Sequence, residues 1–265
     1  DSPARTTNVV DEYMFKSKEE YKALEFMIRN RSYKPDYGQI EREQRIAGDD
    51  VIFRFKIHFE PMQELLNWIM GIEEFSMEWE DNRDEVLKLY EALVEDKRKQ
   101  YPIAANAPVM HVLYGSNVIP QVLGPDRFEK YVLPNYQECA EVMHKRGKKV
   151  GSHMDDNNKI IAHLIAKSGL DYIDAFTPPP TCDMSVKDAM ALWPDKVLWI
   201  NFPSTVHVES AENIKKAMLE ILREAKPGNR LIVGITEDVP MDHWQKSYTA
   251  ILETLNEHGR LPLEE

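Results

Sequence analysis

The chain has 265 residues, of which 43% are apolar, and a formal net charge of −12. This length and composition allow one α/β barrel-sized domain or two smaller domains, and they show neither an apolar run of about 18 residues for a membrane span nor an apolar signal segment. The acidic balance argues against nucleic acid as a partner and disfavours polyanionic substrates, because Lys and Arg alternate with acids along the predicted helices.

These features lead us to expect a cytoplasmic protein without membrane contact. Its two cysteines, Cys139 and Cys182, have neither CxxC nor zinc-ribbon spacing. We therefore expect both thiols to be reduced and neither to be structural.

The first 50 residues form a helical and loop segment before the first strand. Residues 1–15 are polar and patternless, and they resemble the interior of a longer protein more than a beginning. Residues 17–30 predict a helix capped by Ser17, with acids in its first turn. Residues 37–47 predict a second, highly charged helix after a linker that contains Pro35.

The rest of the chain alternates short apolar strands with helices. The predicted strands are residues 51–57, 109–114, 149–154, 172–177, 197–202 and 231–236. The predicted helices are residues 61–70, 82–101, 125–146, 159–167, 186–193, 210–225 and 243–258. No strand pair is joined by a two-residue hairpin turn, so the pattern predicts parallel βαβ units.

Two architectures suit this pattern: a βα barrel and an open doubly wound sheet. No GxGxxG motif follows any strand, which disfavours a nucleotide-binding Rossmann fold. We predict a (β/α)8 TIM-type barrel that forms a single domain over residues 1–265, with its strands and helices in residues 51–265. Because such a barrel has eight strands, six visible strands predict that two precede Asp1.

The strand over residues 149–154 runs directly into a polar cluster, GSHMDDNN, and we take this as the centre of the site. His153 and Asp155 share one face of a strand because side chains alternate with period two. α/β enzymes place reactive groups beyond the carboxyl ends of their strands. A hydrogen-bonded structural histidine is the alternative for His153, and helix capping is the alternative for Asp155 or Asp156.

Polar residues at the other strand ends are further candidates. Asp174 lies inside an apolar strand, where an unpaired carboxylate is costly, so we expect it to have a partner. Glu237 follows the last strand, with helix capping as its alternative. The candidate substrate contacts are His58, Glu60, Asn117 and Asn201.

Four segments give the chain a resemblance to the uroporphyrinogen decarboxylase and corrinoid methyltransferase superfamily. They are residues 125–158, which end in GSHMDDNN, then GLDYIDAF from Gly169, NFPSTV from Asn201, and ITEDVP near the end of the chain. The resemblance covers most of the chain and is weakest before Val51. It implies a (β/α)8 barrel whose usual N-terminal segment is absent here.

The resemblance also implies a metal site with altered ligands. The methyltransferases of the superfamily carry His-x-Cys-Gly at the strand end and a second cysteine after the last strand, which bind zinc. His153 matches, whereas Asp155 stands at the cysteine position and Glu237 lies close to the second cysteine position. A thiolate-rich zinc site is thereby excluded, and a site of His153, Asp155 and Glu237 for zinc or another divalent ion stays open.

We expect from this an enzyme whose catalytic residues are His153, Asp155, Asp174 and Glu237. The leading function is metal-assisted methyl transfer from a small methylated substrate to a corrinoid or thiol acceptor, with the corrinoid on a partner protein by resemblance only. One alternative is decarboxylation of a tetrapyrrole, although the glycine-histidine-glycine sequence of that branch is missing from residues 234–238. Another is a non-catalytic barrel that binds a small ligand, and a homodimer is also open.

Overall fold

The computed structural model describes residues 10–236 and 238–263. The chain divides into two compact units, and each is described by itself. The first unit runs to Asn117 and includes Asp126–Gly151. The second consists of Val118–Pro125 and of the chain from Ser152 onward. The last two residues of the third strand, and every element after it, belong to the second unit.

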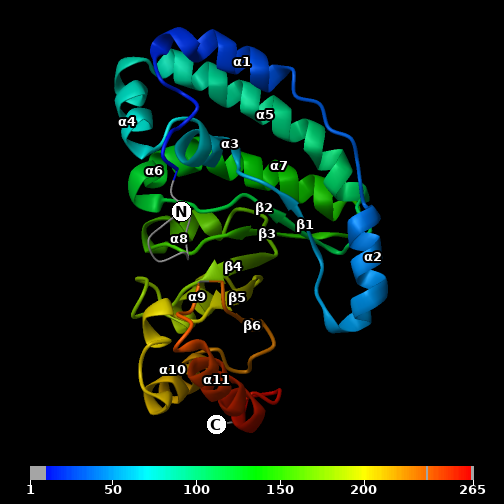
Figure 1. Ribbon diagram of the computed structural model, residues 1–265, viewed down its shortest axis with the longest axis vertical. Helices are drawn as coiled ribbons and strands as arrows, with labels where there is room; N and C mark the ends of the chain where they lie inside the picture. The colour runs from blue at the N-terminus through cyan, green and yellow to red at the C-terminus, as the bar shows by residue number, and fades with distance from the viewer. Residues whose placement is uncertain (1–9, 237, 264–265) are drawn as a thin grey trace. The chain divides into compact units, whose positions relative to one another are not determined.

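All six predicted strands are present. They are β1 (Arg54–Ile57), β2 (His111–Tyr114), β3 (Lys149–His153), β4 (Tyr172–Phe176), β5 (Val197–Asn201) and β6 (Leu231–Gly234). The strands follow one another in chain order in a parallel sheet (Figure 1). Parallel strands that alternate with helices confirm the predicted TIM-type α/β fold.

The strands form because their central residues are β-branched or aliphatic and find apolar partners in register. Val112 of β2 aligns with Val150 of β3 in the first unit, and both are fully buried. Ile173 of β4 aligns with Leu198 of β5 in the second unit, again with both side chains fully buried. Burial on both faces is typical of parallel strands covered by helices.

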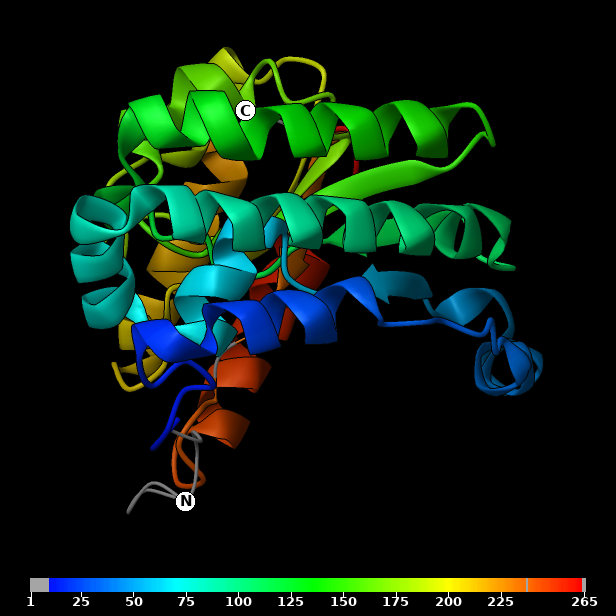
Figure 2. The same ribbon diagram turned by 90° about the horizontal axis from the view of Figure 1, so that it is seen from above.

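The first unit is rich in helices. It contains α1 (Tyr21–Arg29), α2 (Gly38–Ala47), α3 (Pro61–Glu64), α4 (Ile72–Asp81), α5 (Arg83–Asn106) and α7 (Leu133–His144). Figures 1 and 2 show α1, α5 and α7 running alongside one another, and Figure 2 shows α2 end on, to the right of α1. The buried face of α1, with Tyr21, Leu24 and Ile28, explains its packing against α5.

The second unit carries α8 (Ala162–Ile165), α9 (Val186–Leu192), α10 (Ala211–Glu224) and α11 (Trp244–His258). The last two helices pack against each other (Figure 1). Ser185 and Ser210 cap α9 and α10 by accepting a hydrogen bond from the backbone N–H three residues later. The connecting helix α6 (Pro120–Arg127) is kinked at Gly124, whose φ is 67°.

The structure corrects several predicted element boundaries and adds helix α4. β1 begins at Arg54, and Val51 and Ile52 are about half exposed before it. Helix α4 was not predicted, although Phe75 and Trp79 are buried with helical spacing. Helix α5 continues past Pro102 to Asn106 instead of ending before the proline. The predicted helix over residues 125–146 is interrupted by a π-helical turn, Phe128–Val132.

No helix in the described part of the chain combines the length and the apolar character that crossing a bilayer requires.

Candidate functional site

His153 ends β3 and lies between two carboxylates of the second unit. Its Nδ1 is 2.8 Å from Oδ2 of Asp174, and its Nε2 is 3.4 Å from Oδ2 of Asp155. The side chains of His153 and Asp155 are each 21% exposed, whereas that of Asp174 is 3% exposed. One carboxylate therefore anchors the imidazole from the interior, and the other faces its second nitrogen at the solvent-accessible side.

An irregularity in β4 accompanies this arrangement. The pairing of β4 with β5 shifts between Asp174 and Phe176, so that Ala175 is an extra residue in the strand. Ala175 has a φ of 56°. Among the residues that the structure describes, it is the only non-glycine residue with a positive φ. Bulges of this kind change the direction of side chains and are frequent next to active sites. The backbone carbonyl of Asp174 accepts a hydrogen bond of 2.9 Å from the N–H of Met154, which ties β4 to the end of β3.

The two carboxylates decide the charge of the imidazole. Burial by itself would lower the pKa of His153, but the hydrogen bonds and negative charges of Asp155 and Asp174 outweigh burial and raise that pKa to about 9. In the absence of a competing cation, His153 is therefore protonated at neutral pH. A metal ion bound at Nε2 would have to displace that proton.

The loop after β3 is held by its own side chains. Asn158 is buried, and its amide donates to the backbone carbonyls of Met154 and Asp156 at 3.0 and 2.7 Å. A side-chain oxygen of Asp156 accepts from the N–H of Asn157 at 2.6 Å, so Asp156 stabilises the turn and does not cap a helix. Cys182 donates from Sγ to the carbonyl of Asp155 at 3.1 Å, and it is partly buried.

The predicted metal ligands are only partly within the described residues. His153 and Asp155 present an imidazole nitrogen and a carboxylate oxygen to each other, and Asp174 holds the opposite ring nitrogen. Histidine ligands of metals commonly donate their other N–H to a carboxylate in this way. Within residues 10–236 and 238–263, no three His, Cys, Asp or Glu side chains are placed to hold an ion together. Glu237, the third predicted ligand, lies outside the described residues.

Asn201, a predicted substrate contact, joins neighbouring strand ends of the second unit. It is 1% exposed, its Oδ1 accepts from the N–H of Thr236 at 2.8 Å, and its Nδ2 lies 3.4 Å from Oγ1 of Thr177. These contacts give Asn201 a structural role at the ends of β4 and β6.

The strand ends of the first unit place two predicted contacts at the surface. His58 is exposed after β1, and partial burial together with the charges of Lys56 and Lys97 lowers its pKa. Asn117 is exposed after β2, and its carbonyl lies 3.4 Å from the amide nitrogen of Asn67. Among the described residues, neither His58 nor Asn117 forms a hydrogen bond or an ion pair with another predicted site residue of the first unit.

Glu60 is fully buried and caps α3. Its side chain accepts from the backbone N–H groups of Met62 and Gln63 and from the amide of Asn135 at 2.6 Å. In return, the side-chain Oε1 of Gln63 accepts from the backbone N–H of Glu60, which completes a capping box. The capping contacts account for this carboxylate without a substrate.

Ala175 and Cys182 were not predicted as parts of the site. No sequence signal marks an alanine for a left-handed conformation, which glycine or asparagine usually adopts. The contact of Cys182 with the Asp155 carbonyl joins residues 27 positions apart, and only the packing of the β4 loop brings them together.

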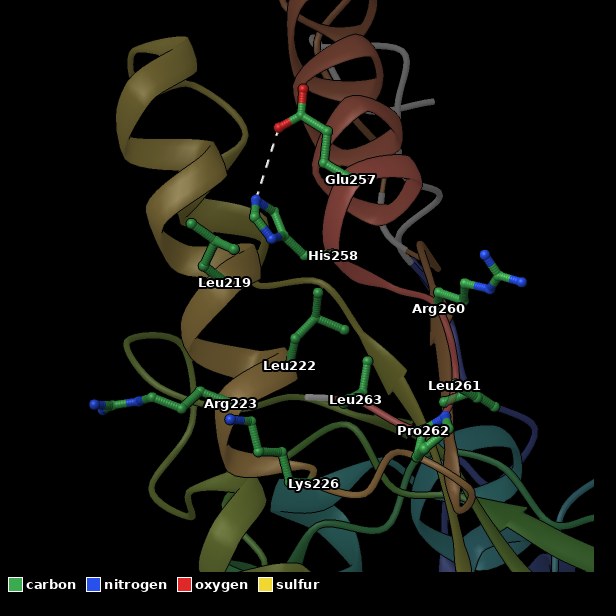
Figure 3. A pocket seen from close by; sticks show the side chains of 10 residues that line it. All are labelled: Leu219, Leu222, Arg223, Lys226, Glu257, His258, Arg260, Leu261, Pro262 and Leu263. Carbon is green, nitrogen blue, oxygen red and sulfur yellow. Dashed lines mark ion pairs between the residues drawn. The ribbon is translucent and has the colours of Figure 1, made fainter. Parts of the chain in front are cut away.

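A cavity of about 690 Å³ lies elsewhere in the second unit, between α10, α11 and the segment after α11 (Figure 3). Leu219, Leu222 and Leu263 contribute apolar surface to it, and no predicted site residue lines it. Figure 3 shows the guanidinium groups of Arg223 and Arg260 pointing away from each other.

Comparisons with known proteins agree with the fold. A profile of the family "Uroporphyrinogen decarboxylase (URO-D)" matches residues 72–258, which is more than half of the chain. The chain belongs to the URO-D family. Among solved structures, a methyltransferase from Methanosarcina mazei has a TM-score of 0.64 with 14% sequence identity. The alignment covers 91% of this chain and 65% of that protein, so this chain spans less than two thirds of its length. No curated protein sequence matches the chain.

Proposed function

We propose that this protein is a metal-assisted methyltransferase of the URO-D family. It would transfer a methyl group from a small methylated substrate to a corrinoid or thiol acceptor. The observation that carries the proposal is the position of His153, with Nδ1 held by Asp174 at 2.8 Å and Nε2 facing Asp155 at 3.4 Å. Family membership and the similarity in fold to a methyltransferase are consistent with it.

The donor set suits a borderline or hard divalent ion. His153 and Asp155 would hold the ion through an imidazole nitrogen and a carboxylate oxygen, which are ligands that zinc and other divalent ions accept. We propose Glu237 as the third ligand, as the sequence predicts. Three protein ligands leave a position open for substrate, as a catalytic site requires.

When bound, such an ion supplies Lewis acidity that stabilises the heteroatom which loses the methyl group. The bond between the methyl carbon and the heteroatom breaks, the heteroatom keeps the electron pair, and the methyl carbon bonds to the acceptor. In the protein, Asp174 fixes the imidazole of His153, so that Nε2 stays directed at the accessible side of the site.

A metal-binding measurement tests the proposal. The parent protein, His153→Ala and the control His163→Ala are prepared without chelator, and bound zinc, manganese, iron and cobalt are measured by elemental analysis. His163 is an exposed histidine on α8 in the same unit, so its loss controls for removal of an imidazole. We expect about one ion per chain in the parent and the control, and a loss of about tenfold or more in His153→Ala.

An activity measurement accompanies it. Methylated phenols and methylated amines are offered as donors, with reduced cobalamin or a thiol as the acceptor, and methylated acceptor is quantified. Equal metal content in the parent and in His153→Ala, or none in any of the three proteins, would contradict the mechanism.

The family match favours one second candidate, the decarboxylation of a tetrapyrrole carboxylate. Carbon dioxide release from uroporphyrinogen by metal-depleted protein, at an undiminished rate, would support that reaction in place of methyl transfer. If neither reaction occurs, a ligand-binding barrel without catalysis is the remaining function.

A further inference from the structure

We propose that Asp174 is a positioning residue for His153, and that the left-handed conformation of Ala175 directs the Asp174 carboxylate at the imidazole. The catalytic purpose of this arrangement rests on the proposed function, whereas the contact between Asp174 and His153 is observed without any metal. It assigns a role to Ala175 and to the bulge in β4.

The first observation is the direction and burial of the contact. Asp174 is 2% exposed, and its Oδ2 lies 2.8 Å from Nδ1 of His153. A carboxylate this deeply buried does not reach solvent, and its hydrogen bond to His153 links it to the accessible side of the site. A carboxylate on Nδ1 fixes the orientation of the ring and increases the basicity of Nε2.

The second observation is the backbone at the next residue. Ala175 is fully buried and has a φ of 56°, a conformation that residues with a side chain rarely adopt. Strained backbone persists only where the surroundings enforce it, and it clusters at functional sites. The carbonyl of Ala175 accepts from Oγ1 of Thr177 at 3.0 Å, which helps to hold the bulge.

The third observation is the register. The pairing advances from Asp174 opposite Trp199 to Phe176 opposite Ile200, so Ala175 has no partner of its own in β5. The extra residue changes the direction of its neighbours while the pairing before and after it is kept. Because of the bulge, the direction of the Asp174 side chain need not follow the regular alternation of side chains along β4.

A spectroscopic test uses the His153 ring proton in 15N-labelled full-length protein. The Nδ1–H proton is expected to give a slowly exchanging resonance because the buried Asp174 carboxylate accepts it, and His153→Ala identifies that resonance by its loss. Asp174→Ala is expected to abolish the resonance, and Asp174→Asn, which keeps an acceptor oxygen, to retain it with faster exchange. If Asp174 does not accept the ring proton in solution, folded Asp174→Ala would leave the resonance unchanged, and that result would overturn the proposal.

Matched pairs of variants test Ala175. Ala189 on α9 is also fully buried, in the same unit, but in a helix. Ala175→Val and Ala189→Val add the same two methyl groups, and only the former is expected to lose the His153 resonance. Ala175→Gly is expected to keep the resonance and the parent urea midpoint, whereas Ala189→Gly, which removes the same methyl group from a helix, is expected to lower the midpoint.

A folded Ala175→Val protein that keeps the resonance, or an equal fall of the midpoint in both glycine variants, would overturn the role of Ala175. If Ala175→Val fails to fold while Ala189→Val folds, the penalty is specific to the backbone conformation, and the Asp174 variants then decide the positioning role. Metal content of Asp174→Ala is measured in parallel, with an expected fall of about tenfold to a hundredfold. Absence of metal from the parent protein would contradict the proposed function and leave the resonance test intact.

Discussion

Two strand ends with similar sequences have different roles in this protein. β1 is followed by His58 and Glu60, and β3 ends in His153 followed by Asp155, so each pairs a histidine with an acid two residues later. At β1, Glu60 is fully buried and engaged in a helix cap, and His58 is exposed. At β3, the histidine and the acid face each other and are both partly accessible.

The difference shows that the partial exposure of the histidine–acid pair distinguishes the candidate site from the structural cluster. Glu60 and Glu64, the buried acids next to β1, are engaged by partners that belong to the fold. Glu64 pairs with Lys97 at 2.5 Å and with Arg31 at 2.7 Å. The amide of Asn135 donates a hydrogen bond to the Glu60 carboxylate. In the second unit, only one side of His153 is used by the interior, through Asp174. The other side remains accessible for chemistry.

The largest expected effect comes from breaking the buried cluster of the first unit. In that cluster the charges of Lys97 and Arg31 outweigh burial and lower the pKa of Glu64. Lys97→Met should lower the free energy of unfolding by about 3–5 kcal/mol, because it removes one partner of a buried ion pair. The control Lys88→Met removes an exposed partner of Glu85 and should change that free energy by less than about 1 kcal/mol.

Urea unfolding of both variants measures the difference. Equal destabilisation by the two changes would mean that the buried pair is not a structural element. The metal content of Lys97→Met should equal that of the parent, since the variant leaves the second unit unaltered.

A smaller effect is expected in the pH dependence of stability. Burial raises the pKa of Glu60 to about 7, against the opposing hydrogen bonds of Asn135, Gln63 and Met62. Because the folded pKa lies above the unfolded value, Glu60 stabilises the fold below about pH 4.5, and this contribution is lost as the pH rises through 7. The expected loss is up to about 3 kcal/mol.

Glu60→Gln cannot titrate and should therefore lack this loss between pH 4.5 and 7.5. Urea unfolding at four pH values in that range, with Glu91→Gln as an exposed control, measures it. Parallel stability curves for the parent and Glu60→Gln would show that Glu60 titrates normally.

The smallest expected effect concerns the accessible side of His153. In metal-free protein, Asp155→Asn removes the carboxylate 3.4 Å from Nε2 and should lower the pKa of His153 from about 9 by about one unit, equivalent to about 1.4 kcal/mol. The stability that the raised pKa provides is present below the unfolded pKa near 6.5 and is lost as the pH rises through 9. The variant should lose less stability over this range.

An NMR titration of the His153 ring measures this shift, and the exposed His163 serves as an internal reference. An unchanged pKa of His153 in Asp155→Asn would mean that the Asp155 carboxylate does not face the imidazole in solution. The histidine–acid pair after β3 would then be no more a site than the pair after β1.

The sequence by itself determined the order and type of the elements that carry the site. Six apolar runs predicted all six strands, because a buried parallel strand needs consecutive apolar residues whatever its neighbours are. The polar residues at the end of β3 predicted His153 and Asp155 as neighbours, because alternation along a strand is local geometry. The need of a buried carboxylate for a partner predicted that Asp174 has one.

Only the tertiary structure decided which partner and which role each residue has. The hydrogen bond between Asp174 and His153 joins residues 21 positions apart. It depends on β3 and β4 being neighbours in the sheet and on a bulge in β4 that no residue propensity predicts. Glu60 and Asp155 look alike in sequence, and burial against Asn135 made the former a cap. Burial and long-range pairing are properties of the folded chain, since they depend on residues that the sequence does not place next to each other.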